Sequence, residues 1–156
     1  MPGAGKSSVG VILAKVLGYE FIDTDLVIQH REKRLLREII EDEGNEGFLA
    51  IENEVNATLE ADKSVIAPGG SAIYGKEAME HFKEIGTIVY LKLSYEDLAK
   101  RLGNLKGRGV VLKEGQTLKD LYDERSKLYE QYAEITVDES GRDIPVSYTH
   151  LRAHET

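Results

Sequence analysis

The chain of 156 residues is long enough for one domain with an ordinary hydrophobic core. Its 28 Asp and Glu residues outnumber its 20 Lys and Arg residues, and the net charge of −8 argues against a surface that binds nucleic acid or an anionic membrane. The absence of cysteine excludes disulfides and thiolate metal sites, and no apolar run is long enough to span a bilayer. We therefore expect a cytoplasmic, monomeric protein whose partner is a small molecule.

The first seven residues, M-P-G-A-G-K-S, match the second half of the phosphate-binding motif G-x-x-x-x-G-K-[ST]. Gly3 and Gly5 would let consecutive backbone N–H groups turn toward phosphate oxygens. Lys6 would reach the β- and γ-phosphates of a nucleotide, and the Ser7 hydroxyl would bind Mg²⁺. An apolar helix pattern over 8–17 places the positive end of a helix at the same phosphates. A glycine turn that merely starts a helix is the weaker interpretation.

Both ends of the sequence depart from a complete kinase pattern. A glycine and a buried strand normally precede the seven matching residues, and residues 145–156 lack the helical apolar stripe expected of a last helix. We therefore predict a truncated kinase domain over 1–144, without its first strand and last helix, and a non-native tail over 145–156. A central strand buries several apolar side chains at roughly 1.5–3 kcal/mol each. We thus expect the chain alone to be unstable and inactive, with an exposed groove beside the phosphate loop.

Strand and helix patterns alternate along the rest of the chain, which is typical of an α/β fold with a parallel sheet. Short apolar runs rich in β-branched residues predict strands over 20–23, 64–67, 86–93 and 134–138. Amphipathic stretches predict helices over 25–41, 47–61, 75–83, 94–102 and 117–132. The prediction is a three-layer α/β/α arrangement.

Two carboxylates, Asp23 and Asp25, follow the strand predicted over 20–23. Ligands of parallel sheets bind beyond the carboxyl ends of the strands, so both carboxylates should face the cleft of the phosphate loop. One could hold Mg²⁺ and the other could accept a proton from a substrate hydroxyl. The competing interpretation is that Asp25 is only the N-cap of the following helix.

Four segments resemble the shikimate kinase family: the loop M-P-G-A-G-K-S, the run F-I-D-T-D, the turn A-P-G-G-S-A, and the stretch R-S-K-L-Y-E-Q-Y-A with I-T-V-D after it. The resemblance covers residues 1 to about 144. It implies the nucleoside-monophosphate-kinase-like P-loop fold, with ATP and Mg²⁺ as cofactors. It also implies phosphorylation of a hydroxyl of a small hydroxylated acid, as in aromatic amino acid biosynthesis.

The same resemblance implies roles for individual residues. The implied catalytic residues are Lys6, Asp25 as the base, and Arg108. The implied ATP site consists of Gly3, Ala4, Gly5, Lys6, Ser7, Ser8, Arg101, Arg108 and Arg142. The implied acceptor site consists of Asp25, Gly69, Gly70 and Arg125, and the implied Mg²⁺ ligands are Ser7 and Asp23.

The sequence around two of these arginines also supports a functional role without the family resemblance. A phosphoryl-transfer site in an acidic protein must gather positive charge locally, because the transition state carries negative charge on its equatorial oxygens. Arg108 lies between two glycines, as expected of a loop that closes over the phosphates, although an ordinary surface arginine fits there too. Arg125 lies within a predicted helix, where a plain solvated arginine fits nearly as well.

Two positions depart from the family pattern. Leu49 stands where the pattern has an arginine that grips the substrate carboxylate, and Ser71 stands where a third glycine is usual. Losing a charge-assisted hydrogen bond costs roughly 1.5–3 kcal/mol, which weakens affinity about ten- to a hundred-fold. Three hypotheses stay open: a shikimate kinase-like enzyme, a kinase of the same fold for a gluconate- or homoserine-like acceptor, or an inactive nucleotide-binding fragment.

Overall fold

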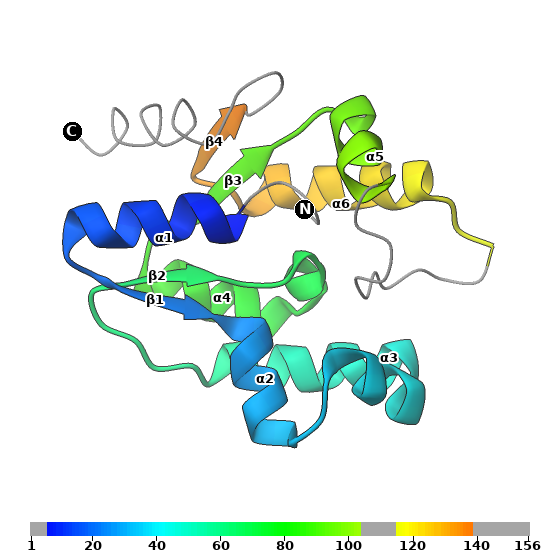
Figure 1. Cartoon of the computed structure of the whole chain (residues 1–156), viewed down its shortest axis with the longest axis horizontal. Helices are drawn as coiled ribbons and strands as arrows, with labels where there is room; N and C mark the ends of the chain where they lie inside the picture. Colours follow the sequence, from blue (N-terminus) through cyan, green and yellow to red (C-terminus); the bar gives the residue numbers. More distant parts are fainter. Residues whose placement is uncertain (1–5, 104–114, 139–156) are drawn as a thin grey trace.

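The computed structural model describes residues 6–103 and 115–138, which form two pairs of short parallel strands (Figure 1). The strands are β1 (Glu20–Asp23), β2 (Ser64–Ala67), β3 (Val89–Lys92) and β4 (Ile135–Asp138). β1 pairs with β2, and β3 pairs with β4. No backbone ladder joins the two pairs within the described residues.

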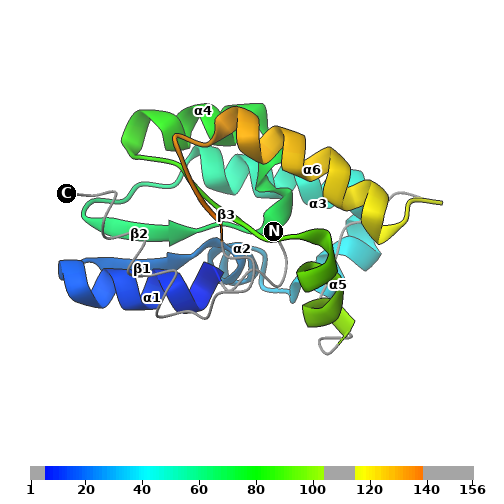
Figure 2. The same ribbon diagram turned by 90° about the horizontal axis from the view of Figure 1, so that it is seen from above.

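Helices lie on both faces of these strands. They are α1 (Lys6–Leu17), α2 (Thr24–Glu32), α3 (Leu36–Ala57), α4 (Lys76–Ile85), α5 (Tyr95–Gly103) and α6 (Leu118–Tyr132), with a 3₁₀ helix η1 (Gly70–Tyr74). α1 covers one face, whereas α4 and α6 lie on the opposite face (Figure 2). The layers are therefore those of the predicted three-layer α/β/α arrangement.

Helix α1 links the two strand pairs on its face. Val9 is buried against Leu91 of β3 and Val137 of β4. One residue further, a Cβ added at Gly10 would lie 2.7 Å from the Phe21 ring of β1, so the helix backbone runs close to β1 as well. Packing against α1 thus holds the two pairs together where no backbone hydrogen bonds do.

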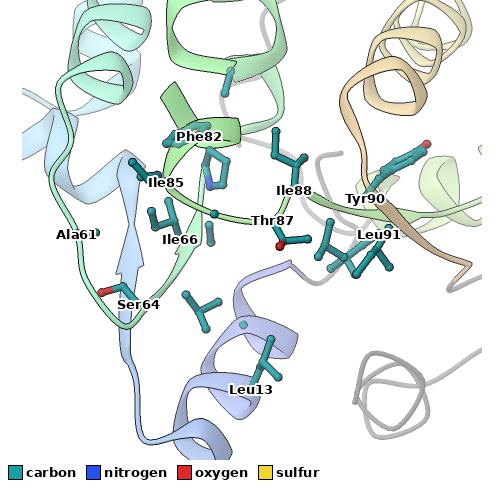
Figure 3. Close-up of a pocket in the computed structure, with 18 of the residues that line it drawn as sticks. Leu13, Ala61, Ser64, Ile66, Phe82, Ile85, Thr87, Ile88, Tyr90 and Leu91 are labelled. Atoms are coloured by element: carbon teal, nitrogen blue, oxygen red, sulfur yellow. The ribbon is translucent and has the colours of Figure 1, made fainter. Parts of the chain in front are cut away.

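A cavity of about 700 Å³ lies between the two strand pairs (Figure 3). Leu13 of α1 lines one side, Phe82 of α4 lines the other, and Ile66 and Ile88 belong to the segments that flank it. The facing edges of β2 and β3 have no strand partner among the described residues. This is the exposed groove that the sequence predicted, and it lies beside the helix that follows the phosphate loop.

The boundary between α2 and α3 differs from the prediction. α2 ends at Glu32, and its C-cap Lys33 adopts a left-handed conformation with φ of 55°. α3 is kinked at Gly44, whose φ of 74° and ψ of 175° are non-helical and separate two helical stretches. The two helices fold back on each other because Ile28 of α2 is buried against Ile39 and Phe48 of α3. The predicted gap between helices at residues 42–46 coincides with this kink, whereas the break after Glu32 was not predicted, because it depends on the packing of Ile28 against α3.

The groove leads to a prediction about stability. Joining an extended apolar segment of five Val and Ile residues ahead of Met1 should raise the urea midpoint of unfolding, because such a strand can pair with β2 and β3 and bury side chains against α1 and α4. This extended chain is compared with a chain carrying five Ser and Gly residues at the same place. Equal midpoints for the two extensions would show that the groove does not accept a strand.

Candidate active site

The carboxyl ends of β1 and β2 carry the acidic turn and the glycine turn predicted from the sequence. The parallel register places Asp23 at the end of β1 opposite Ala67 at the end of β2. The residues that follow both strands therefore emerge at one edge. The N-terminus of α1 lies at this end of the molecule (Figure 1). This is the edge where parallel α/β proteins bind their ligands.

Asp23 and Asp25 have different tasks. Asp23 is the N-cap of α2, and its Oδ1 accepts a hydrogen bond from the Asp25 N–H at 3.0 Å. Asp25 lies in the first turn of the helix, and its Oδ1 is 2.9 Å from the position that a Cβ at Gly69 would take. The interpretation of Asp25 as the helix cap is therefore wrong, and its carboxylate faces the glycine turn.

A second carboxylate, which the sequence reasoning did not select, faces the same point. Oε2 of Glu52 lies 3.0 Å from the same Cβ position at Gly69, and only 1% of Glu52 is exposed. Its Oε1 accepts a hydrogen bond from the hydroxyl of Ser71, also buried, at 2.6 Å. The signal available in the sequence was an acidic residue on the apolar face of α3, between the buried Phe48 and Val55.

Arg125 of α6 lies on the other side of the glycine turn. It is 1% exposed, so the interpretation as a solvated arginine is wrong. Its guanidinium carbon lies 5.5 Å from the ring centroid of Tyr74, within the range of a cation–π contact. The Tyr74 hydroxyl in turn donates a hydrogen bond to Glu124 at 2.8 Å. α6 therefore brings a buried cation to η1, immediately after the turn at Gly69 and Gly70.

Tyr129 fixes the turn itself. Its hydroxyl donates a hydrogen bond to the Gly70 carbonyl oxygen at 2.6 Å. Burial raises the pKa of the Tyr129 phenol well above its ordinary value, so the group stays protonated and remains a donor. The sequence could predict this tyrosine as a core residue of an amphipathic helix, but not its bond to a backbone 59 residues away.

Several predicted site residues lie outside the described part of the structure: Gly3, Ala4, Gly5, Arg108 and Arg142. The backbones of Lys6, Ser7 and Ser8 begin α1 and that of Arg101 belongs to α5, but their side chains also lie outside it. The structure thus places Asp25 beside Gly69 and Arg125 beside η1, and the roles of these residues, like the ATP site, stay predictions.

The described carboxylates suit a Mg²⁺ ion that phosphates help to hold. Among residues 6–103 and 115–138, no group of three or more His, Asp or Glu side chains could hold a metal ion. Asp23 uses Oδ1 for the cap, and Oδ2 accepts no hydrogen bond from this part of the chain. Mg²⁺ is usually bound through one or two carboxylates plus water and substrate phosphates, so a single carboxylate at this edge fits it.

Comparison with known proteins decides the family, because the shikimate kinase family model matches residues 2–153. The chain belongs to the shikimate kinase family. Shikimate kinase 2 of Yersinia pseudotuberculosis serotype O:3 (strain YPIII) is 34% identical over 145 residues, covering 87% of this chain and 81% of that protein. Shikimate kinase 2 of Yersinia enterocolitica is 32% identical, covering 98% of this chain and 92% of that protein.

Solved shikimate kinases share the fold. A structure described as shikimate kinase from Acinetobacter baumannii in complex with shikimate aligns with a TM-score of 0.83 and 33% identity, covering 97% of this chain and 87% of that one. Shikimate kinase from Bacteroides thetaiotaomicron aligns with a TM-score of 0.79 and 26% identity, covering 98% and 93%. The predicted P-loop kinase fold and the predicted class of enzyme, an ATP-dependent phosphotransferase, are confirmed. In the described residues, no helix is long and apolar enough to cross a membrane.

Tyr129→Phe tests the hydrogen bond between the Tyr129 hydroxyl and the Gly70 carbonyl oxygen in this shikimate kinase homologue. Removing the hydroxyl leaves the Gly70 carbonyl without its donor, which should lower the free energy of unfolding by about 1–3 kcal/mol and raise the KM for the acceptor. Urea unfolding and steady-state kinetics measure the two effects. Tyr132→Phe is the matched control, because the Tyr132 hydroxyl makes no hydrogen bond within the described residues. Equal unfolding free energies and equal KM values for the two variants would show that this hydrogen bond does not hold the glycine turn.

Proposed function

We propose that this chain transfers the γ-phosphoryl group of ATP to a hydroxyl of shikimate. The observation that carries the proposal is the arrangement around Gly69, where Asp25 and Glu52 direct one oxygen each at a backbone that has no side chain. Arg125 adds a buried cation beside the next turn, η1. Two carboxylates and one arginine suit an acceptor that has hydroxyls and a carboxylate. The relative crystallised in complex with shikimate supports this choice of acceptor.

Asp25 is the proposed base. It stands at the carboxyl end of β1, one turn from the strand, and faces the glycine backbone across a gap too narrow for a Cβ. An acceptor hydroxyl bound beside this gap, within hydrogen-bond reach of Asp25, can pass its proton to Asp25 as its oxygen attacks the γ-phosphorus. Gly69 and Gly70 let the acceptor approach the backbone closely, because neither carries a side chain.

The charge on the transferred group requires cations. Lys6 and Arg108 are the proposed groups that stabilise it, with Arg101 and Arg142 near the nucleotide. Ser7 and Asp23 would hold Mg²⁺, which neutralises charge on the phosphate oxygens. Arg125 is the proposed partner of the acceptor carboxylate, and its burial favours a strong interaction because the surroundings exclude water.

One observation favours a different acceptor. Leu49 packs against the apolar cluster of Ile28, Ile39, Phe48 and Val55, so α3 offers no cation at that position for a carboxylate. An acceptor of the gluconate or homoserine type that presents an alkyl face to Leu49 would suit such a pocket. A coupled ADP-release assay with shikimate, gluconate and homoserine, on the chain and on the extended chain, decides between the acceptors. If neither the chain nor the extended chain releases ADP with any of the three acceptors, the result would support the hypothesis of an inactive nucleotide-binding fragment.

Asp25→Asn should lower kcat about a hundred-fold or more while the KM for ATP stays nearly unchanged. Asn keeps the size of Asp but cannot accept the proton, and a positioned base contributes roughly 10²–10⁴-fold. Initial rates at saturating acceptor measure the effect. Asp62→Asn is the control, since Asp62 is an exposed residue ahead of β2, at the opposite end of the strand from the site. Unchanged turnover in Asp25→Asn would remove Asp25 from the mechanism.

Lys6→Ala should abolish ATP turnover without a loss of stability. The motif predicts that this ammonium contacts phosphates, so its charge matters to the nucleotide and not to the core. The same ADP-release assay is read together with a thermal melt, which should be within experimental error of that of the unmodified chain. Activity close to that of the unmodified chain would contradict the phosphate-loop assignment.

A further inference from the structure

Ser71 and Glu52 form a buried pair that connects two separate elements of the acceptor site. Ser71 lies in η1 with 7% exposure, and Glu52 lies in α3 with 1%. The hydroxyl donates to Oε1 of the carboxylate at 2.6 Å, a short distance typical of a hydrogen bond to a charged oxygen. A carboxylate this deeply buried is costly unless donors satisfy it. The serine hydroxyl is therefore part of what makes Glu52 possible here.

The hydrogen bond also determines which way the carboxylate points. With Oε1 held by Ser71, Oε2 lies 3.0 Å from the place of a Cβ at Gly69, the same place that Oδ1 of Asp25 approaches to 2.9 Å. The two carboxylates therefore converge on one backbone position. Rotation of the Glu52 carboxylate about its last bond would move Oε2 away from that point, and the bond to Ser71 opposes this rotation.

The part of α3 around Glu52 carries no cation that could orient this carboxylate. From residue 47 to residue 57, α3 contains neither lysine nor arginine. Position 49 precedes Glu52 by three residues, so the two side chains are neighbours on the helix surface. Position 49 carries leucine, which packs against the apolar cluster of α2 and α3. A cation at position 49 would be the simplest alternative means of holding this carboxylate.

We propose that Ser71 is a positioning residue of the acceptor site, whose hydroxyl orients the Glu52 carboxylate toward Gly69 and Asp25 in place of a cation at position 49. The inference rests on the proposed function in that Oε2 of Glu52 then faces the acceptor hydroxyls. It assigns to Ser71 and Leu49 a joint effect: the serine hydroxyl holds Oε1 of Glu52, and an uncharged leucine stands at the neighbouring helix position.

The test is a double-mutant cycle of Ser71→Ala and Leu49→Arg in the chain, with shikimate as the acceptor. Ser71→Ala should raise the KM for shikimate roughly ten- to a hundred-fold, with kcat and the KM for ATP each changing less than about threefold. Leu49→Arg should reverse most of that rise in the Ser71→Ala background, because the guanidinium can hold Glu52. In the presence of Ser71 it should have a much smaller effect on the same KM.

Ser64→Ala is the matched control, because the Ser64 hydroxyl donates to the Asp62 carbonyl at the other end of β2. It should leave all three kinetic constants unchanged. A merely structural role for Ser71 would lower the melting temperature without a selective change in KM, and Leu49→Arg would not reverse the change. Either an unchanged KM in Ser71→Ala or equal effects of Leu49→Arg in both backgrounds would overturn the proposal.

Urea unfolding of the same four chains needs no substrate and separates this proposal from the proposed function. Ser71→Ala and Leu49→Arg should be non-additive in the unfolding midpoint, since both act on Glu52. Additive midpoints overturn the pairing whatever the acceptor is. If the urea midpoints are non-additive but the chain does not phosphorylate shikimate, the pairing of Ser71 with Glu52 is supported. The proposal that shikimate is the acceptor is then overturned.

Discussion

Carboxylate oxygens of Asp25 and Glu52 converge on Gly69, where they lie 2.9 and 3.0 Å from the position of its absent Cβ. An L-residue at this position would have to displace one carboxylate or the other. Asp25 belongs to the start of α2 and Glu52 to the core face of α3, so a side chain at position 69 would press on two separate elements. The glycine is therefore the point at which three elements of the acceptor site meet.

Helix α6 contributes the buried Arg125 to the site, next to η1. Arg125 is a full positive charge with almost no exposure, and such a group destabilises a fold unless its surroundings compensate it. The aromatic face of Tyr74 supplies part of that compensation, and a bound carboxylate would supply more. Such a cation beside the glycine turn is consistent with the proposed role of Arg125 as the partner of an acceptor carboxylate. The same helix supplies Tyr129, so the cation and the glycine turn are held by one rigid element.

Local patterns predicted much of this architecture, and long-range contacts account for what they missed. The strands over 20–23 and 64–67 were predicted with their observed bounds, because short apolar runs between turns depend little on distant residues. The gap predicted around Gly44 coincides with the kink in α3, whereas the break between α2 and α3 after Glu32 was missed, because it depends on the packing of Ile28 on α3. The acid pair, the glycine turn and Arg125 were found from motifs and from the family resemblance. Glu52, Ser71 and Tyr129 act through partners 19 to 59 residues away, and no local pattern contains that information.

The groove between the strand pairs links stability to the geometry of the site. α1 carries the predicted phosphate-binding residues Lys6 and Ser7 at its N-terminus and touches both strand pairs, whereas the predicted acceptor residues belong mainly to the β1–β2 side and to α6. The distance between the nucleotide and the acceptor therefore depends on how the two pairs are spaced. Side-chain packing alone controls that spacing across the described residues, because no ladder crosses the groove. A misplacement of about 1 Å between reacting groups can cost on the order of a hundred-fold in rate. A strand paired with both β2 and β3 would fix the spacing with directional hydrogen bonds, so the same change that stabilises the fold should also sharpen the alignment of the acceptor with the phosphate.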